Sequence, residues 1–230
     1  MSRALFDADF GDRAPRLLAP GAVHVPGWLE PEAQRWIAEQ FRRWAAGPVP
    51  PRGARIRGHE MSVKTVCLGW HWQPYRYSRT ADDVNGRPVL DLPDWMVRMG
   101  RRALADVEQD PAVAAFAGES ATYRPDTALA NFYTESASMG MHQDKDEKSG
   151  APVVSISLGD ACTFRLGNPE HRGRPYRDIL LASGDLLIFG GPSRFAYHGV
   201  TKVHPGTAPA DCGVEGGRIN ITLRETGLSG

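Results

Sequence analysis

The pattern of hydrophobic and polar positions changes near the middle of the chain. Beyond Pro125, short β-prone runs follow one another, separated by turns of Gly, Asn, Asp and Ser. Closely spaced strands without intervening helices predict an antiparallel sandwich or barrel rather than a parallel, doubly wound sheet. A jelly roll is the natural candidate, because its two sheets leave a mouth where strand ends can supply ligands. The expected strands are residues 128–134, 153–158, 162–166, 178–182, 185–189 and 218–224.

Two helices are expected in the first half of the chain. Over residues 30–46, apolar and aromatic side chains recur every three to four positions, which predicts an amphipathic helix with Pro31 in its first turn. Residues 94–108 show a similar pattern. The Pro-, Gly- and Arg-rich residues 47–58 fit neither period, so we expect a loop or linker there.

Length and charge narrow the possible classes of protein. At 230 residues, one domain with a single core is expected rather than two full domains. The 27 basic residues balance the 27 acidic ones, so no global positive field indicates nucleic acid. Arginines crowd residues 35–57, where they could line a phosphate-facing surface or form an ordinary solvated face.

Cysteine usage and the N-terminus bear on the compartment. Cys67, Cys162 and Cys212 are odd in number, widely spaced and without a Cys-x-x-Cys pair, which indicates neither a disulfide framework nor a zinc finger. The first ten residues carry acids where a signal peptide needs an apolar core, and no apolar run approaches spanning length. We therefore expect a cytoplasmic protein with no membrane partner.

The strongest chemical signal is His142-Gln143-Asp144. Residues two apart on an extended strand project from the same face, so one metal ion could contact both His142 and Asp144. His198 follows another strand-like run and is the candidate third ligand, with His204 as the fallback. Two histidines and a carboxylate form a facial triad, which suits non-haem Fe(II) that must hold a co-substrate and O2.

A chance occurrence has to be set beside this interpretation. His-x-Asp is a short motif, and the charged run that follows it could be a solvated loop. The remaining histidines lie in Pro-, Gly- or Arg-rich surroundings, without a carboxylate at strand spacing, and are interpreted as surface or lid residues. They are His24, His59, His71 and His171.

The last expected strand offers a second set of polar side chains. In residues 218–224, Arg218, Asn220, Thr222 and Arg224 fall on one face and apolar residues fall on the other. That polar face could simply be solvated. If it points into the barrel instead, its two arginines need anionic partners, and a dicarboxylate held at the metal would provide them.

Taken together, these segments resemble the AlkB family of bacterial alkylated-nucleobase repair dioxygenases. The likeness covers most of the chain; residues 1 to about 20 and the Pro/Arg-rich segment lie outside it. The segments that carry it are residues 61–63, 68–70, 131–133, 142–147, 190–199 and 218–224.

The resemblance implies the roles of the metal and co-substrate residues. His142, Asp144 and His198 would ligate Fe(II), and 2-oxoglutarate would chelate the metal. Arg224 would pair with the distal carboxylate of 2-oxoglutarate, and Arg218 would approach the carboxylate near the metal. The remaining residues implied to complete the co-substrate pocket are Asn131, Tyr133 and Asn220.

Substrate recognition is expected in the front half. Four aromatic rings lie within residues 70–77, and a base taken out of its stack needs a flat partner. Core packing is the alternative, although no single period covers all four rings. By resemblance, Trp70 would lie against the flipped base, Asp146 would meet its cationic part, and further contacts would come from Met61, Tyr75 and Tyr77. The loop with Arg172 and Arg174 differs in length from the family pattern, so neither arginine is assigned a role.

The resemblance also implies the fold and the activity. The expected fold is α+β, mainly β with peripheral helices, and has a double-stranded β-helix (jelly-roll) core. Residues 1–20 would be a tail and residues 21–230 one domain, with helices and a nucleotide-recognition lid in 21–125 and the core in 126–230.

The expected reaction is oxidative demethylation of bases such as 1-methyladenine and 3-methylcytosine in single- or double-stranded DNA, with RNA as a further target. It would convert 2-oxoglutarate and O2 to succinate and CO2 and release formaldehyde, in a monomeric protein. The alternatives are the same chemistry on methylated tRNA, protein or a small molecule, and a non-enzymatic metal- or nucleic-acid-binding barrel.

Overall fold

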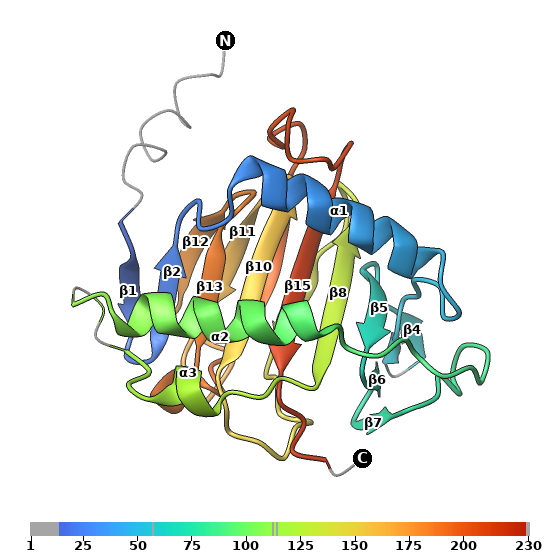
Figure 1. Cartoon of the computed structure of the whole chain (residues 1–230), viewed down its shortest axis with the longest axis horizontal. Coiled ribbons are helices and arrows are strands. Elements are labelled where there is room, and N and C mark those ends of the chain that lie inside the picture. Colours follow the sequence, from blue (N-terminus) through green and yellow to red (C-terminus); the bar gives the residue numbers. More distant parts are fainter. Residues whose placement is uncertain (1–13, 57, 112, 114, 229–230) are drawn as a thin grey trace.

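Two antiparallel sheets form the centre of the computed structural model, which describes residues 14–56, 58–111, 113 and 115–228 (Figure 1). The larger sheet runs β1 (Arg16–Ala19), β2 (Ala22–Val25), β13 (Leu186–Phe189), β10 (Val153–Gly159), β15 (Arg218–Arg224), β8 (Thr127–Tyr133) and β5 (Lys64–Leu68). The smaller sheet runs β12 (Arg177–Leu181), β11 (Ala161–Leu166), β14 (His198–His204) and β9 (Met139–His142). This is the mainly β, jelly-roll core that the sequence predicted.

Helices cover the outer face of the larger sheet. The helices α1 (Pro31–Ala45) and α2 (Asp94–Glu108) run side by side across it, and the short α3 (Glu119–Thr122) follows (Figure 1). Apolar residues of both helices join one buried cluster with the outward residues of β10 and β15, as the periodicity of residues 30–46 and 94–108 predicted. That cluster includes Ile37, Phe41, Met96, Leu104, Ile156 and Ile221.

A second buried cluster fills the space between the two sheets. Phe189 and Leu187 of β13 meet Phe164 of β11 and Val200 of β14 there. The larger sheet is therefore covered on both faces, which explains why its central strands are continuous hydrophobic runs.

The last strand divides its side chains between these two layers. Ile219, Ile221 and Leu223 belong to the cluster under the helices, whereas Arg218 and Arg224 line a cavity between the sheets. The polar face of β15 thus points inward and is not solvated. Of the two arrangements open from the sequence, the structure has the one that buries both arginines.

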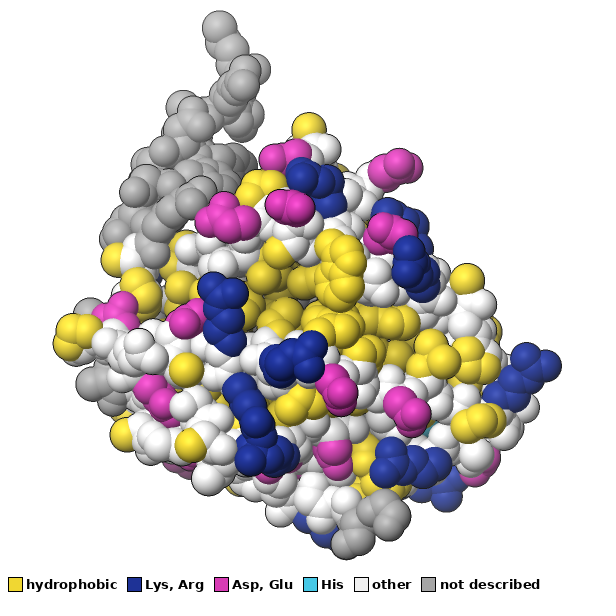
Figure 2. All heavy atoms as spheres, viewed as in Figure 1, with side chains coloured by type: hydrophobic (Ala, Val, Ile, Leu, Met, Phe, Trp, Pro, Cys, Tyr) yellow, Lys and Arg dark blue, Asp and Glu magenta, His cyan; other side chains and the backbone are white. Residues whose placement is uncertain are grey.

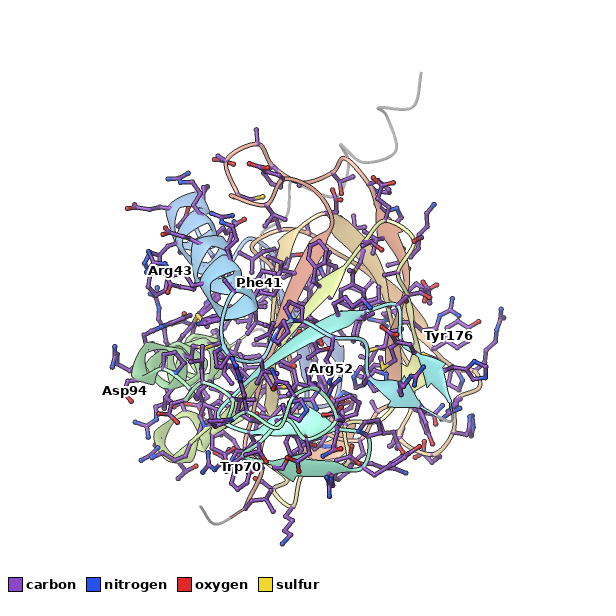
Figure 3. The ribbon with its side chains drawn as sticks, turned by 90° about the vertical axis from the view of Figure 1, so that its right-hand side faces the viewer. Phe41, Arg43, Arg52, Trp70, Asp94 and Tyr176 are labelled. Carbon is purple, nitrogen blue, oxygen red and sulfur yellow. The ribbon has the colours of Figure 1, made fainter. Side chains whose placement is uncertain are left out.

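Two small hairpins lie beside β5, the strand at one edge of the larger sheet (Figure 1). The first joins β3 (Arg55–Ile56) to β4 (His59–Glu60), and the second joins β6 (His71–Gln73) to β7 (Arg76–Ser78). Figure 3 looks at this side of the molecule, with Trp70 low in the view and Arg52 above it. Gly69 turns the chain from β5 into β6 with φ of +76°, where a Cβ atom would lie 2.0 Å from the Asp126 carbonyl oxygen.

The first half contributes more to the sheet than its pattern predicted. The strands β1, β2 and β5 were not predicted, and β1 lies within residues 1–20, expected to be a tail; residues 1–13 lie outside the described residues. Residues 47–58 are irregular except for the short β3 and an isolated bridge from Arg52 to Thr65. These strands were missed because each has only four or five residues, too few to show a clear period.

The arginines of residues 35–57 serve different purposes. Arg35 and Arg42 donate to the carbonyl oxygens of Asp211 and Gly213, and Arg52 is largely buried under the second hairpin. Residue 57 lies outside the described residues.

On the face shown in Figure 2, hydrophobic side chains fill the gap between α1 and α2, and basic and acidic groups flank it. Within the described ranges, no helix combines the length and apolarity that crossing a bilayer requires.

Candidate metal and co-substrate site

Two neighbouring strands of the smaller sheet bring the predicted metal ligands together. His142 ends β9 and His198 begins β14, and the two are register partners with ring centroids 4.5 Å apart. Asp144 follows β9, and its carboxylate oxygens lie 3.5 Å from Nε2 of His142 and 3.6 Å from Nε2 of His198. One donor atom from each residue lies within 4.8 Å of the others, so a single ion can contact all three.

The second nitrogen of each histidine ring is already occupied. Nδ1 of His142 lies 3.0 Å from the Gly140 carbonyl oxygen, and Nδ1 of His198 lies 2.9 Å from that of Ala196. A carbonyl only accepts, so Nδ1 carries the proton and the Nε2 lone pair faces Asp144. This is the tautomer that a metal ligand needs, with the ring orientation fixed from behind.

Arg224 holds the acidic ligand in its charged form. Its Nη2 lies 2.8 Å from Oδ2 of Asp144. Burial alone would raise the pKa of the Asp144 carboxyl, but the guanidinium, helped by the two histidines, holds that pKa well below its ordinary value. Burial lowers the pKa of His198, whereas in His142 the contact with Asp144 outweighs burial and raises it.

A buried ion network continues from Arg224. Its Nη1 donates to Oε1 of Glu147 at 3.0 Å, and Nη2 of Arg194 donates to Oε2 at 3.2 Å. Arg194 also donates to the carbonyl oxygen of Asp144 at 2.6 Å, so the network fixes the backbone that carries the ligand. The sequence pattern included Glu147 only as part of the acidic run and did not predict its role in this network. No motif indicated a role for Arg194.

The cavity between the sheets contains the expected co-substrate residues. Besides the three candidate ligands, its polar lining is Asn131, Tyr133, Ser155, Arg218, Asn220, Thr222 and Arg224. Arg218 is 1% exposed and donates from Nη2 to Ser157 Oγ at 2.9 Å, but its Nε and Nη1 have no partner among the described residues. A buried guanidinium with free donors requires an anion, and a carboxylate has the matching geometry.

Other polar groups of the cavity are held in place. Asn131 accepts from Thr65 Oγ1 at 2.8 Å, and Asn220 donates to Ser155 Oγ at 2.8 Å. Burial raises the pKa of Tyr133, which therefore keeps its phenolic proton as a donor at neutral pH.

The two arginines are arranged in the opposite sense to the expectation. Arg224 contacts the metal ligand Asp144, whereas Arg218 lies six positions earlier on β15, roughly 20 Å along the strand. The order was not visible in the sequence, because strand alternation gives the face of a side chain and not its neighbour on the opposite sheet.

The rival histidines lie elsewhere. His204 ends the same strand as His198 and bonds through Nε2 to Thr163 Oγ1 at 2.8 Å, outside the cluster. His24, expected at the surface or in a lid, is buried and contacts Asp185 at 2.8 Å. The choice of His198 as third ligand agrees with the geometry.

Residues 70–78, which contain the β6–β7 hairpin and are called the aromatic hairpin below, expose their four rings to different extents. Trp70 is 8% exposed, donates to Asp126 Oδ2 at 3.1 Å, and has the Arg79 guanidinium 3.8 Å from its ring centroid. Tyr75 is at the hairpin tip, 71% exposed, with φ of +76°. A tyrosine in the left-handed region is strained, and such strain is retained mostly where function requires the side chain.

The rings of Trp72 and Tyr77 form hydrogen bonds to the segment that follows Asp144. Trp72 donates from Nε1 to Asp146 Oδ2 at 2.8 Å, and the Tyr77 hydroxyl donates to Glu147 Oε1. Met61, Trp70, Tyr75, Tyr77 and Asp146 do not line the cavity between the sheets. Arg174 and Arg172 lie over the rings of Tyr176 and Tyr197.

The site and fold agree with the comparison to known families. The sequence profile of the 2OG-Fe(II) oxygenase superfamily matches residues 21–224, and the chain belongs to that family. The enzyme is therefore an Fe(II)/2-oxoglutarate-dependent dioxygenase that uses O2. The alternative of a non-enzymatic barrel is not supported.

Within this family the chain is AlkB-like. It is 37% identical over 216 residues to an alpha-ketoglutarate-dependent dioxygenase AlkB homolog of Caulobacter vibrioides, covering 91% of this chain and 90% of that one. It is 36% identical over 178 residues to AlkB of Escherichia coli, covering 74% of each. A solved structure of OsALKBH1 superposes with a TM-score of 0.80 at 31% identity, covering 91% of this chain and all of that one.

The residues present fit both cofactors. The orphaned donors of Arg218 match a carboxylate of 2-oxoglutarate, and the two Nε2 atoms with Asp144 supply the two-histidine, one-carboxylate donor set that Fe(II) takes in such enzymes. The sequence-based expectation of Fe(II), 2-oxoglutarate and O2 is confirmed.

Proposed function

We propose that this protein removes N-linked methyl groups from bases such as 1-methyladenine and 3-methylcytosine in DNA, with RNA as a further target. The single observation that carries the nucleic-acid part is the bonding of an aromatic hairpin to the acidic residues directly after a metal ligand. Aromatic rings stack on bases, and a carboxylate has the right sign for a methylated, positively charged base. Its relatives include AlkB of Escherichia coli and a protein of Arabidopsis thaliana named DNA N(6)-methyladenine demethylase ALKBH1D.

The proposed roles follow the positions of the side chains. His142, Asp144 and His198 hold Fe(II). Arg218 binds the distal carboxylate of 2-oxoglutarate and Arg224 lies at the metal end, which reverses the assignment made from the resemblance. Asn131, Tyr133 and Asn220 complete the pocket. The bound metal supplies the chemistry in which 2-oxoglutarate and O2 yield succinate and CO2 and the N-methyl group is lost as formaldehyde.

The protein's own residues orient these groups and exclude water. Phe189 and Phe164 pack against the His198 ring at centroid distances of 4.9 and 5.7 Å. These two phenylalanine rings keep water away from His198. Arg224 keeps the carboxylate of Asp144 ionised. Asp146 receives the cationic base, with Tyr75 at the hairpin tip and Met61 as outer contacts of the nucleic acid. Trp70 stacks on a base through the face that Arg79 does not cover.

A substrate panel tests the proposal. Oligonucleotides with 1-methyladenine or 3-methylcytosine are incubated with Fe(II) and with or without 2-oxoglutarate, and their masses are followed together with formaldehyde and succinate. We expect loss of the methyl group only when 2-oxoglutarate is present. Succinate formation without any demethylated oligonucleotide would overturn the nucleic-acid assignment and leave the dioxygenase chemistry standing.

A second candidate keeps the chemistry and changes the substrate to methylated tRNA, protein or a small molecule. The balanced charge of 27 basic and 27 acidic residues favours it, because a nucleic-acid enzyme gains affinity from net positive charge. Methylated tRNA, peptides and free nucleosides in the same panel distinguish the two, since the first candidate requires the DNA oligonucleotide to have the highest kcat/KM.

A further inference from the structure

Trp72 is the aromatic residue of the hairpin to which the sequence gave no role. It lies opposite Tyr77 in the register of β6 and β7, so both side chains leave the same face of the hairpin. They reach successive residues of the acidic segment, Asp146 and Glu147. We propose that Trp72 is a positioning residue for charge selectivity: its indole N–H fixes the Asp146 carboxylate that recognises a cationic base. This inference rests on the proposed function.

The backbone of Trp72 is anchored at both polar groups. Its N–H donates to Cys67 Sγ at 3.4 Å, and its carbonyl oxygen accepts from Arg52 Nη2 at 2.5 Å. Arg52 is itself held by Asp83 at 3.1 Å. The indole N–H is therefore a donor presented from a fixed frame, as a positioning residue requires.

Asp146 needs such a donor because it lies in an irregular segment, between the ends of two strands. Its neighbours Asp144 and Glu147 are each held by Arg194 and Arg224. In the described part of the chain, Trp72 is the side chain that donates to Asp146, through Oδ2, and Oδ1 receives none. One oxygen is thus fixed and the other is left for a ligand.

The chemical nature of the donor matters. An indole N–H donates without carrying charge, so it orients the carboxylate and leaves its full negative charge for the base. A lysine or arginine in its place would also donate, but would neutralise the group. The pair therefore selects for methylated bases that are cationic, such as 1-methyladenine and 3-methylcytosine, over neutral ones such as 1-methylguanine and 3-methylthymine.

The test compares Trp72→Phe and Trp72→Lys with Trp36→Phe as a matched control, because Trp36 is a half-exposed tryptophan on α1 that contacts Trp95. The measured quantity is the ratio of kcat/KM for cationic over neutral lesions in otherwise identical oligonucleotides. We expect Trp72→Phe to lower the ratio about tenfold, mainly through KM, which corresponds to one hydrogen bond to a charged group. Trp72→Lys should lower it further, and Trp36→Phe should leave it unchanged.

A second readout does not depend on turnover. Binding of the same oligonucleotides to metal-free protein, followed by fluorescence anisotropy, should show the same loss of preference in both Trp72 variants. If Trp72→Phe lowers kcat/KM for cationic and neutral lesions equally, or changes neither, the ratio stays at its wild-type value. That result would overturn the role of Trp72 while the proposed function stands. If the wild-type enzyme demethylates no oligonucleotide, the proposed function fails and this inference fails with it.

Discussion

Arg224 and Asp144 form an ion pair between the sheets, with Nη2 of the arginine 2.8 Å from Oδ2 of the aspartate. The same guanidinium binds Glu147 through Nη1 at 3.0 Å. The metal ligand is thus tied to a buried network that also bonds to the aromatic hairpin through Tyr77. The candidate iron ligand Asp144, the cavity between the sheets and the aromatic hairpin are therefore joined by one set of contacts, and the role proposed for each can be tested separately.

Removal of a metal ligand should abolish turnover. In His142→Ala, Asp144→Ala or His198→Ala, one of three donors is lost, and we expect no detectable succinate and a loss of Fe(II) affinity measured by anaerobic calorimetry. His204→Ala is the matched control, because His204 lies on the same strand as His198 but outside the cluster. Full activity in any of the three ligand variants would contradict the assignment.

Arg218→Lys should raise KM for 2-oxoglutarate while the protein still binds iron. The lysine keeps the charge but loses the planar array of guanidinium donors, of which Nε and Nη1 have no partner among the described residues. We expect an increase of about tenfold or more, the size of one charge-assisted hydrogen bond. Steady-state kinetics at varied 2-oxoglutarate measure it, and an unchanged KM would show that the distal carboxylate binds elsewhere.

Glu147→Gln should destabilise the fold by about 3 kcal/mol, because it leaves Arg194 and Arg224 short of a buried counter-charge. Urea denaturation of the metal-free protein gives the free energy of unfolding. Glu39→Gln removes the exposed i,i+4 partner of Arg43 and should change that free energy by less than about 0.5 kcal/mol. Equal effects of the two substitutions would mean that burial of the network contributes nothing.

His71 should make stability depend on pH. Burial lowers the pKa of His71, although its contact with Asp83 opposes the shift, so the folded state binds a proton less readily than the unfolded chain. The contribution of His71 to the free energy of unfolding is therefore fully present above the unfolded pKa of about 6.5. It is lost as the pH falls below that value. Denaturation midpoints from pH 8 to pH 5 should fall more steeply for the wild-type protein than for His71→Gln. Parallel profiles would show that His71 is not the group responsible.

Tyr75→Gly should separate stability from binding. Glycine adopts the left-handed φ of +76° without strain, so we expect the free energy of unfolding to rise by about 1 kcal/mol. The exposed ring is lost at the same time, so KM for a methylated oligonucleotide should increase. Thermal unfolding and oligonucleotide kinetics on one preparation measure both quantities. A loss of stability without any change in KM would mean that the ring packs within the protein.

Most strands of the second half were predictable because their apolar residues are continuous or alternate along the chain, but β9 and β14 were not among the expected ranges. The expected 153–158 became Val153–Gly159, and 218–224 became β15 without change of bounds. The strands β1, β2 and β5 were not predicted, since each is short, and β2 and β5 also pair with strands far away in sequence. Gly184 and Asp185 are typical of a turn between two hairpin strands, yet they connect β12 and β13, which belong to different sheets.

The sequence by itself determined which residues can bind a metal and which face of the last strand is polar, because ligand type and strand alternation are local properties. It could not place Arg224, rather than Arg218, next to Asp144, or bring Trp72 and Tyr77 to Asp146 and Glu147. These contacts join segments some seventy or more residues apart, and only the packing of two sheets and an edge hairpin decides which side chains meet.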